Sequence, residues 1–286
     1  MKLYRQFESQ EDIDREYDLS HSIPDATPFR DFYSASNKLA AQLLKSEQRV
    51  KYGPSQDERL DIFPAQTKNA PVLVFIHGGY WRSKHSEDYH FVSLGPHKAG
   101  LLTVVINYSL CPKVRIEEIT RQCRGAMIWL KTNISGYGGD PENMVVAGHS
   151  AGGHLAAQLL STDWEQDYGL THSPIRGAMA ISGIFDLRPL QYSFLQPKLM
   201  LDSVTIQRES PLFQLPKSAP HLTVSVGSEE PNEFLRQSKD YYEAWKEKGL
   251  PGSYFEQKES NHYTAINGFT QPKSPLMTEI LRLFSS

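Results

Sequence analysis

The segment around Ser150 has the residue types and the spacing of a nucleophilic serine. Residues 148–152 read G-x-S-x-G, directly after the apolar run 144–147 and directly before a stretch of small residues with helical character. A nucleophile on so tight a turn has a strained backbone, and side chains two residues before or after it would collide with the flanking strand and helix. Gly148 and Gly152 supply that clearance. The pattern therefore predicts Ser150 as a nucleophile at the positive end of a helix.

A second glycine motif offers hydrogen-bond donors for a negative oxygen. The letters HGGYW stand at 77–81, directly after an apolar run. Glycine lets the backbone come within hydrogen-bond distance of an oxyanion that a side chain would block. We expect the N–H groups of Gly78, Gly79 and Ala151 to form an oxyanion hole. We expect His77 to hold this loop by hydrogen bonds.

A serine nucleophile needs a base that takes its proton and an acid that orients this base, in the chain order serine, acid, histidine. Of the ten histidines, His262 alone follows the last expected strand. For the acid we expect Glu230, just past the apolar run 222–226. Three other carboxylates remain alternatives: Glu229, Glu233 and Asp186.

These motifs lie within an alternation of strand and helix patterns. Apolar runs rich in β-branched residues predict eight strands, at 48–52, 59–63, 72–76, 102–107, 144–147, 177–181, 222–226 and 253–257. Helical periodicity predicts helices at 32–44, 115–131, 151–161, 232–248 and 275–284. The alternation predicts an α/β fold, with a mostly parallel eight-stranded sheet and helices on both faces.

Two segments fit neither a strand nor a helix of this alternation. Residues 1–30 are charged and aromatic, and residues 186–220 are rich in Pro, Leu, Phe and Tyr. The length favours a single domain over residues 1–286. The two segments either form a small cap over one end of the sheet or are ordinary surface loops.

Composition excludes several classes of protein. The 30 Lys and Arg and 33 Asp and Glu residues are interspersed, so no basic field for nucleic acid exists. No apolar run approaches the roughly 18 residues of a membrane span. The charged residues 1–20 do not resemble a secretory signal, and Cys111 and Cys123 are expected to be reduced thiols of a cytoplasmic protein. The oligomeric state stays open, with a homodimer as one alternative.

Neither a metal nor a cofactor is expected. His149 and His154, like His85 and His90, lie five residues apart and lack the H-E-x-x-H spacing that brings ligands onto one helix face. The glycine-rich run 136–139 lacks the third glycine of a dinucleotide fingerprint.

With these motifs the chain resembles the kynurenine formamidases, or arylformamidases, of the α/β-hydrolase fold, which are relatives of the hormone-sensitive-lipase-like esterases. The family carries Asp at the acid position, where this chain has the longer Glu230. The similarity extends over most of the chain: HGGYW at 77–81, AGHSAGGHLA at 147–156, SGIFDL at 182–187, VGSEEPNEF at 226–234 with RQS at 236–238, and NHY at 261–263.

The resemblance implies hydrolysis of N-formyl-L-kynurenine to L-kynurenine and formate in tryptophan degradation. Ser150 would attack the formyl carbon and form a formyl-serine, with His262 as base and Glu230 orienting it. An aromatic formamide has a bulky leaving group, so we expect an apolar wall with Tyr80 and Phe185 as its candidates. The alternatives are a general carboxylesterase for small acyl esters and, more remotely, a non-catalytic binding module on the same fold.

Overall fold

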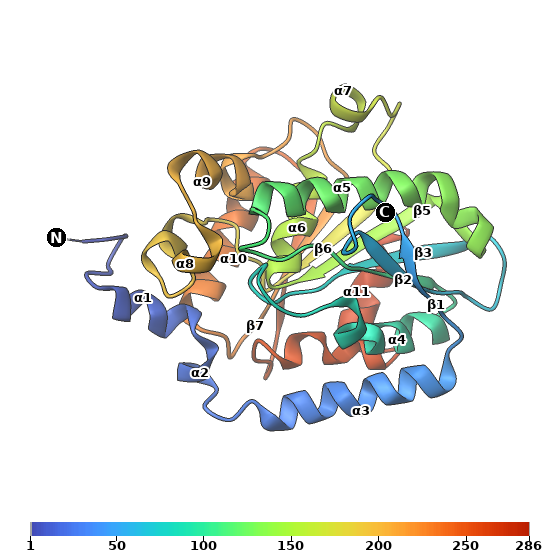
Figure 1. Cartoon of the computed structure of the whole chain (residues 1–286), viewed down its shortest axis with the longest axis horizontal. Coiled ribbons are helices and arrows are strands. Elements are labelled where there is room, and N and C mark those ends of the chain that lie inside the picture. Colours follow the sequence, from blue (N-terminus) through green and yellow to red (C-terminus); the bar gives the residue numbers. More distant parts are fainter. Residues whose placement is uncertain (1, 286) are drawn as a thin grey trace.

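One sheet of eight strands forms the centre of the protein in the computed structural model, which describes residues 2–285 (Figure 1). The strands are β1 (Glu47–Lys51), β2 (Arg59–Phe63), β3 (Ala70–Ile76), β4 (Leu102–Ile106), β5 (Gly139–His149), β6 (Gly177–Ile181), β7 (His221–Gly227) and β8 (Gly252–Gln257). Their order across the sheet is β1-β2-β4-β3-β5-β6-β7-β8. β2 is antiparallel to both of its neighbours, and the remaining neighbours are parallel. The predicted strands and the mostly parallel sheet are confirmed.

Helices cover both faces of this sheet. They are α1 (Gln10–Tyr17), α2 (Leu19–Ser22), α3 (Thr27–Leu43), α4 (Leu94–Lys98), α5 (Ile116–Asn133), α6 (Ala151–Leu160), α7 (Trp164–Tyr168), α8 (Gln196–Leu199), α9 (Ser203–Glu209), α10 (Asn232–Glu247) and α11 (Pro275–Leu283). In Figure 1, α5 lies above the sheet, and α3, α4 and α11 lie below it. All five predicted helices are present, with ends that differ by a few residues.

The alternation of side chains along β3 explains why both faces are covered. Val72, Val74 and Ile76 belong to the apolar core shared with α5 and α6, whereas Leu73 and Phe75 belong to the core shared with α3, α4 and α11. All five side chains are fully buried. A strand buried on both faces has a continuous apolar run, which is the pattern that located this strand in the sequence.

The segment before β1 is more regular than the sequence analysis expected. Helix α1 begins with a capping box in which Ser9 accepts from the N–H of Asp12, and its Ile13 and Tyr17 are fully buried. α3 begins at Thr27, five residues earlier than predicted, with a proline in its first turn. Short helices, α8 and α9 among them, also occupy the segment 186–220. The predicted helices do not include these short ones, because tertiary contacts stabilise helices too short to show a strong period.

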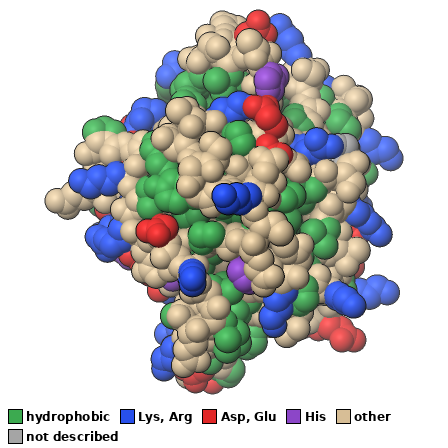
Figure 2. All heavy atoms as spheres, turned by 90° about the vertical axis from the view of Figure 1, so that its right-hand side faces the viewer, with side chains coloured by type: hydrophobic (Ala, Val, Ile, Leu, Met, Phe, Trp, Pro, Cys, Tyr) green, Lys and Arg blue, Asp and Glu red, His purple; other side chains and the backbone are tan. Residues whose placement is uncertain are grey.

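The surface agrees with the charge pattern of the sequence. Figure 2 shows the face at the right of Figure 1, where Lys and Arg side chains are dispersed over the surface with a few Asp and Glu among them. Cys111 and Cys123 are free thiols, and both are buried. Among residues 2–285, no helix combines the length and the apolar character that a membrane crossing requires.

Candidate active site

Ser150 occupies a sharp turn between β5 and α6. Its backbone has φ 58° and ψ −120°, a left-handed conformation that a non-glycine residue rarely adopts. A Cβ atom on Gly148 would overlap the carbonyl of Gly152, and a Cβ on Gly152 would overlap the carbonyl oxygen of Ile76 at the end of β3. The steric need for both glycines, predicted from the sequence, is confirmed.

The HGGYW loop lies directly against this turn. A Cβ on Gly78 would lie 2.9 Å from Cβ of Ser150, so the loop passes the serine without room for a side chain. Gly79 has φ 115° and lines the same pocket as Ser150, while Ala151 begins α6. The first N–H groups of a helix have no partner within the helix. The structure thus brings the three expected oxyanion donors, Gly78, Gly79 and Ala151, around one serine.

His77 fits the loop-holding role expected for it. It is fully buried, its Nδ1–H donates to the carbonyl of Gly78 at 2.8 Å, and its ring stacks on Tyr108 with the ring centres 4.3 Å apart. Burial lowers the pKa of His77 to about 4, so the ring is neutral near pH 7.

His262 and Glu230 form a hydrogen-bonded pair near Ser150. Nδ1 of His262 lies 2.6 Å from Oε2 of Glu230, and both residues are buried. The other carboxylate oxygen, Oε1, accepts from the hydroxyl of Ser182 at 2.5 Å and from the N–H of Gly227 at 2.8 Å. Because the carboxylate takes Nδ1, the Nε2 atom of His262 is the nitrogen available to a proton from Ser150. Ser150 and His262 line the same pocket.

None of the three alternative acids contacts His262: one is exposed, and two have other side-chain partners. Glu229 is exposed. Glu233 pairs with Arg236 at 2.7 Å and accepts from the hydroxyl of Tyr17 at 2.9 Å. Asp186 is held by two side chains, Arg188 and Tyr4, each at 2.7 Å. Of the four candidate carboxylates, the structure brings only Glu230 into contact with His262.

Two residues of this site were missed in the sequence analysis. His149, the second residue of the G-x-S-x-G pattern, donates from Nε2 to the carbonyl oxygen of His262 at 2.9 Å, and burial lowers its pKa well below the ordinary value. Ser182 lies at the carboxyl end of β6 and contacts Glu230. Their positions next to the nucleophile and at a neighbouring strand end are the signals that could have identified them.

A pocket of about 350 Å³ opens over Ser150 and His262. Its volume is in the range of about 300–1,000 Å³ that is usual for small-molecule sites. Six aromatic side chains contribute to its wall, namely Tyr17, Tyr33, Tyr80, Tyr89, Phe194 and Tyr263. Four charged side chains also line it: Asp18, Arg30, Arg82 and Lys84. Residues 17–30 of the first segment therefore contribute one side of the pocket.

The two expected wall residues lie in different places. Tyr80 lines the pocket and donates from its hydroxyl to the carbonyl of Tyr17 at 2.5 Å. Phe185 does not line it. Its ring is fully buried and stacks on Tyr241 at 4.2 Å, because the chain turns at Ser182, which has φ 52°, and directs Phe185 into the core. The expectation for Phe185 is therefore corrected.

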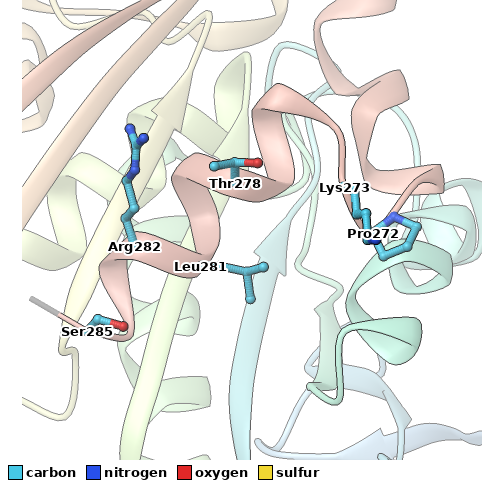
Figure 3. A pocket seen from close by; sticks show the side chains of 6 residues that line it. All are labelled: Pro272, Lys273, Thr278, Leu281, Arg282 and Ser285. Carbon is cyan, nitrogen blue, oxygen red and sulfur yellow. The ribbon is translucent and has the colours of Figure 1, made fainter.

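A second hollow, of about 510 Å³, lies on α11, away from these groups. Figure 3 shows that its side chains are spread along one helix and the loop before it, and do not converge on a common point. Arg282, one of them, is paired with Glu279. Such a surface lacks the convergent polar groups of a catalytic site.

Comparisons with known proteins agree with this geometry. The BD-FAE family profile matches residues 60–244. The kynurenine formamidase of Danio rerio is 31% identical over 254 residues, which are 86% of this chain and 84% of the relative. A candidate thioesterase from Silicibacter sp. TM1040 has a TM-score of 0.82 at 29% identity, covering 94% of this chain and 98% of its own.

The fold is shared more widely than the sequence. An esterase of Pyrobaculum calidifontis has a TM-score of 0.73 at 17% identity, and the match covers 96% of each chain. Such low identity shows only the common α/β-hydrolase fold. The family assignment rests on the profile match and on the formamidase relative, which is matched over most of its length. The chain therefore belongs to the BD-FAE family and to the kynurenine formamidase family.

Proposed function

We propose that this protein hydrolyses N-formyl-L-kynurenine to L-kynurenine and formate in the degradation of tryptophan. One observation carries the proposal: Ser150 and His262 line one aromatic pocket, with Glu230 hydrogen-bonded to His262, in a chain that is 31% identical to a kynurenine formamidase over 84% of that protein's length. The ordered pair of Glu230 and His262, next to a serine on a strained turn, is the arrangement that activates a serine hydroxyl.

The first half of the reaction forms a formyl-serine. Oγ of Ser150 attacks the formyl carbon while Nε2 of His262 takes the hydroxyl proton. The oxyanion that develops is bound by the N–H groups of Gly78, Gly79 and Ala151. When the carbon–nitrogen bond breaks, the histidine gives its proton to the aryl amine nitrogen, and L-kynurenine leaves.

The second half releases formate. A water molecule attacks the formyl carbon and passes a proton to His262, and a second oxyanion forms at the same donors. The ester bond then breaks and the proton returns to Oγ of Ser150. Glu230 remains ionised throughout and stabilises the imidazolium that forms in each half.

The walls of the pocket favour a bulky leaving group over a bulky acyl group. The backbone of Gly78 passes so close to Ser150 that little space is available for an acyl chain, whereas aromatic side chains line the remaining volume. A formyl group needs almost no space, and an aryl amine fits an aromatic wall. The same machinery would serve a general carboxylesterase, which is the competing function.

The deciding experiment compares kcat/KM for N-formyl-L-kynurenine, formanilide, p-nitrophenyl acetate and p-nitrophenyl butyrate on one preparation, with the Ser150→Ala variant as the blank. We expect N-formyl-L-kynurenine to be the best substrate and butyrate the poorest, because added methyl groups press on the HGGYW loop. If the butyrate ester matches or exceeds N-formyl-L-kynurenine, the carboxylesterase function replaces the formamidase.

We also propose that residues 1–30 and 186–220 act as a small cap on a single domain. Tyr17 and Arg30 from the first segment and Phe194 from the second line the pocket, which supports this role.

We propose a cytoplasmic location as well. The buried free thiols Cys111 and Cys123 support a reducing, cytoplasmic setting. Cell fractionation followed by immunodetection tests the location.

A further inference from the structure

Arg82 is an unpaired cation held in the wall of the pocket. It follows the HGGYW loop directly, and its backbone N–H donates to the carbonyl of Gly79 at 3.1 Å. The side chain is half-buried, and its guanidinium lies over the ring of Phe194, 5.3 Å from the ring centre. Arg82 takes part in none of the ion pairs formed within residues 2–285. A guanidinium oriented by an aromatic ring and lacking a carboxylate partner is prepared to bind an anion.

The other two cations of the pocket are less suited to that role. Arg30 and Lys84 are both exposed, so their flexible side chains lose more entropy when they bind a ligand. Lysine also lacks the planar fork that matches a carboxylate. Arg82 is therefore the cation in this pocket that is best placed for a bidentate contact.

Asp18 supplies the opposite charge to the same pocket. It is half-buried, and its Oδ1 accepts from the N–H of Ser20 at 3.0 Å at the start of α2. Within the described part of the chain, no Lys or Arg pairs with it. Burial raises the pKa of Tyr80 well above its ordinary value, Asp18 raises it further and Arg82 lowers it. Asp18 and Arg82 both line the pocket, and both act on the phenol of Tyr80, which lines it as well.

We propose that Arg82 and Asp18 form a subsite for the zwitterionic end of an amino acid, in which Arg82 binds the α-carboxylate and Asp18 the α-ammonium group. The inference rests on the proposed function, because the leaving group L-kynurenine carries both charges on one carbon. An ammonium paired with a carboxylate, and a carboxylate held by a guanidinium fork, are charge-assisted hydrogen bonds.

The subsite contacts the leaving group far from the reacting carbon. Its contacts are the same in the bound substrate and in the transition state, so their loss raises KM and leaves kcat nearly unchanged. This separates the subsite from a residue that supports the serine, the histidine or the oxyanion donors, whose loss lowers kcat.

The test uses three formamides with the same aryl ketone. N-formyl-L-kynurenine carries both charges, N-formylkynuramine lacks only the carboxylate, and N-formyl-2-aminoacetophenone lacks both. The variants are Arg82→Gln, Arg82→Lys and Asp18→Asn. The asparagine keeps a side-chain oxygen that can cap α2. Arg282→Gln on α11 is the matched control, because it removes an exposed arginine from a helix that contributes nothing to this pocket.

We expect Arg82→Gln to lower kcat/KM for N-formyl-L-kynurenine by about 10- to 100-fold, and to leave the other two formamides within about threefold of the wild type. Arg82→Lys should retain part of the activity. Asp18→Asn should lower kcat/KM for both ammonium-bearing substrates and spare N-formyl-2-aminoacetophenone. The Kd of L-kynurenine for Ser150→Ala, measured by calorimetry, should rise by the same factor when Arg82→Gln is added.

Equal losses of kcat/KM on all three formamides in the Arg82→Gln and Asp18→Asn variants would overturn the proposal, because they would show a structural role. An unchanged kcat/KM for N-formyl-L-kynurenine in these variants would overturn it as well. A failure of the proposed function looks different: the wild-type protein would then hydrolyse none of the three formamides better than p-nitrophenyl butyrate.

Discussion

Ser182 donates a 2.5 Å hydrogen bond to the same carboxylate that holds His262, that of Glu230. Its own backbone is fixed, because its N–H donates to the carbonyl of Ser225 on β7 at 2.7 Å and its φ is 52°. The strand ends of β6 and β7 thus share in orienting the acid. Such a support orients the long side chain of Glu230, which has one more rotatable bond than an aspartate.

We expect Ser182→Ala to lower kcat by about 10-fold with little change in KM, because a charge-assisted hydrogen bond that orients the acid is lost. Ser182→Gly should give the same loss although it relieves the strained φ. Steady-state kinetics with N-formyl-L-kynurenine check both variants, and Ser173→Ala, on the loop before β6, serves as the control. Recovery of kcat in the glycine variant would assign the effect to the backbone instead.

Glu230→Asp should lower kcat by about 10-fold or more, since the shorter side chain cannot keep both the Ser182 contact and the 2.6 Å contact with His262. Glu230→Ala should be more damaging, although less so than the loss of Ser150. Glu229→Ala should have no effect, because this side chain is exposed. A larger kcat loss in Glu229→Ala or Asp186→Ala than in Glu230→Ala, in variants that remain folded, would mean that the acid has been misassigned.

Ser150→Ala and His262→Ala should each lower kcat by about 1,000-fold or more, and the double variant should be hardly worse than either. The reason is that the two residues act as a unit: without the hydroxyl of Ser150 no formyl-serine forms, and His262 then has no step of this mechanism to assist. Single-turnover measurements at high enzyme concentration give the residual rates. Multiplicative losses would contradict a shared role.

Stability should fall as the pH is lowered from about 6.5 to about 4. Burial lowers the pKa of both His77 and His154 to about 4, whereas an unfolded histidine titrates near 6.5, so the unfolded chain binds protons first. Each imidazole contributes up to about 3 kcal/mol of unfolding free energy at pH 7 that is lost over this range.

The variant His154→Gln isolates one of these contributions. Its unfolding free energy, measured with urea at several pH values, should decrease less between pH 6.5 and 4 than that of the wild type. Parallel curves would show that this ring does not titrate differently in the folded and unfolded chains.

The strands and the sharp turn at Ser150 could be predicted because their signals are local. The run Val72–Ile76 is apolar on both faces of the sheet. A side chain at position 148 or 152 would overlap a main-chain carbonyl, so a protein with this turn needs glycine at both positions. The carboxylate next to His262 could be predicted only by its position in the chain. The sequence does not show that Glu233 and Asp186 form ion pairs with arginines instead of contacting His262.

The pocket wall could not be predicted in the same way. Phe185 follows a serine with positive φ, and the pattern around it gives no sign that its ring turns into the core. Helix α1 depends on the burial of Ile13 and Tyr17. Tyr17 donates a hydrogen bond to Glu233, which is 216 positions away, and such long-range contacts leave no local period in the sequence.

The contact between Gly152 and the carbonyl of Ile76 has a consequence for how this protein can change over evolution. It holds the main chain of α6, the helix that follows Ser150, against the main chain at the end of β3, the strand that leads to the HGGYW loop. This contact does not involve the side chains that line the pocket. Positions 18, 30, 82 and 194 line the pocket and lie outside this contact. Substitutions there can therefore alter the preferred leaving group without disturbing the main-chain contact beside Ser150.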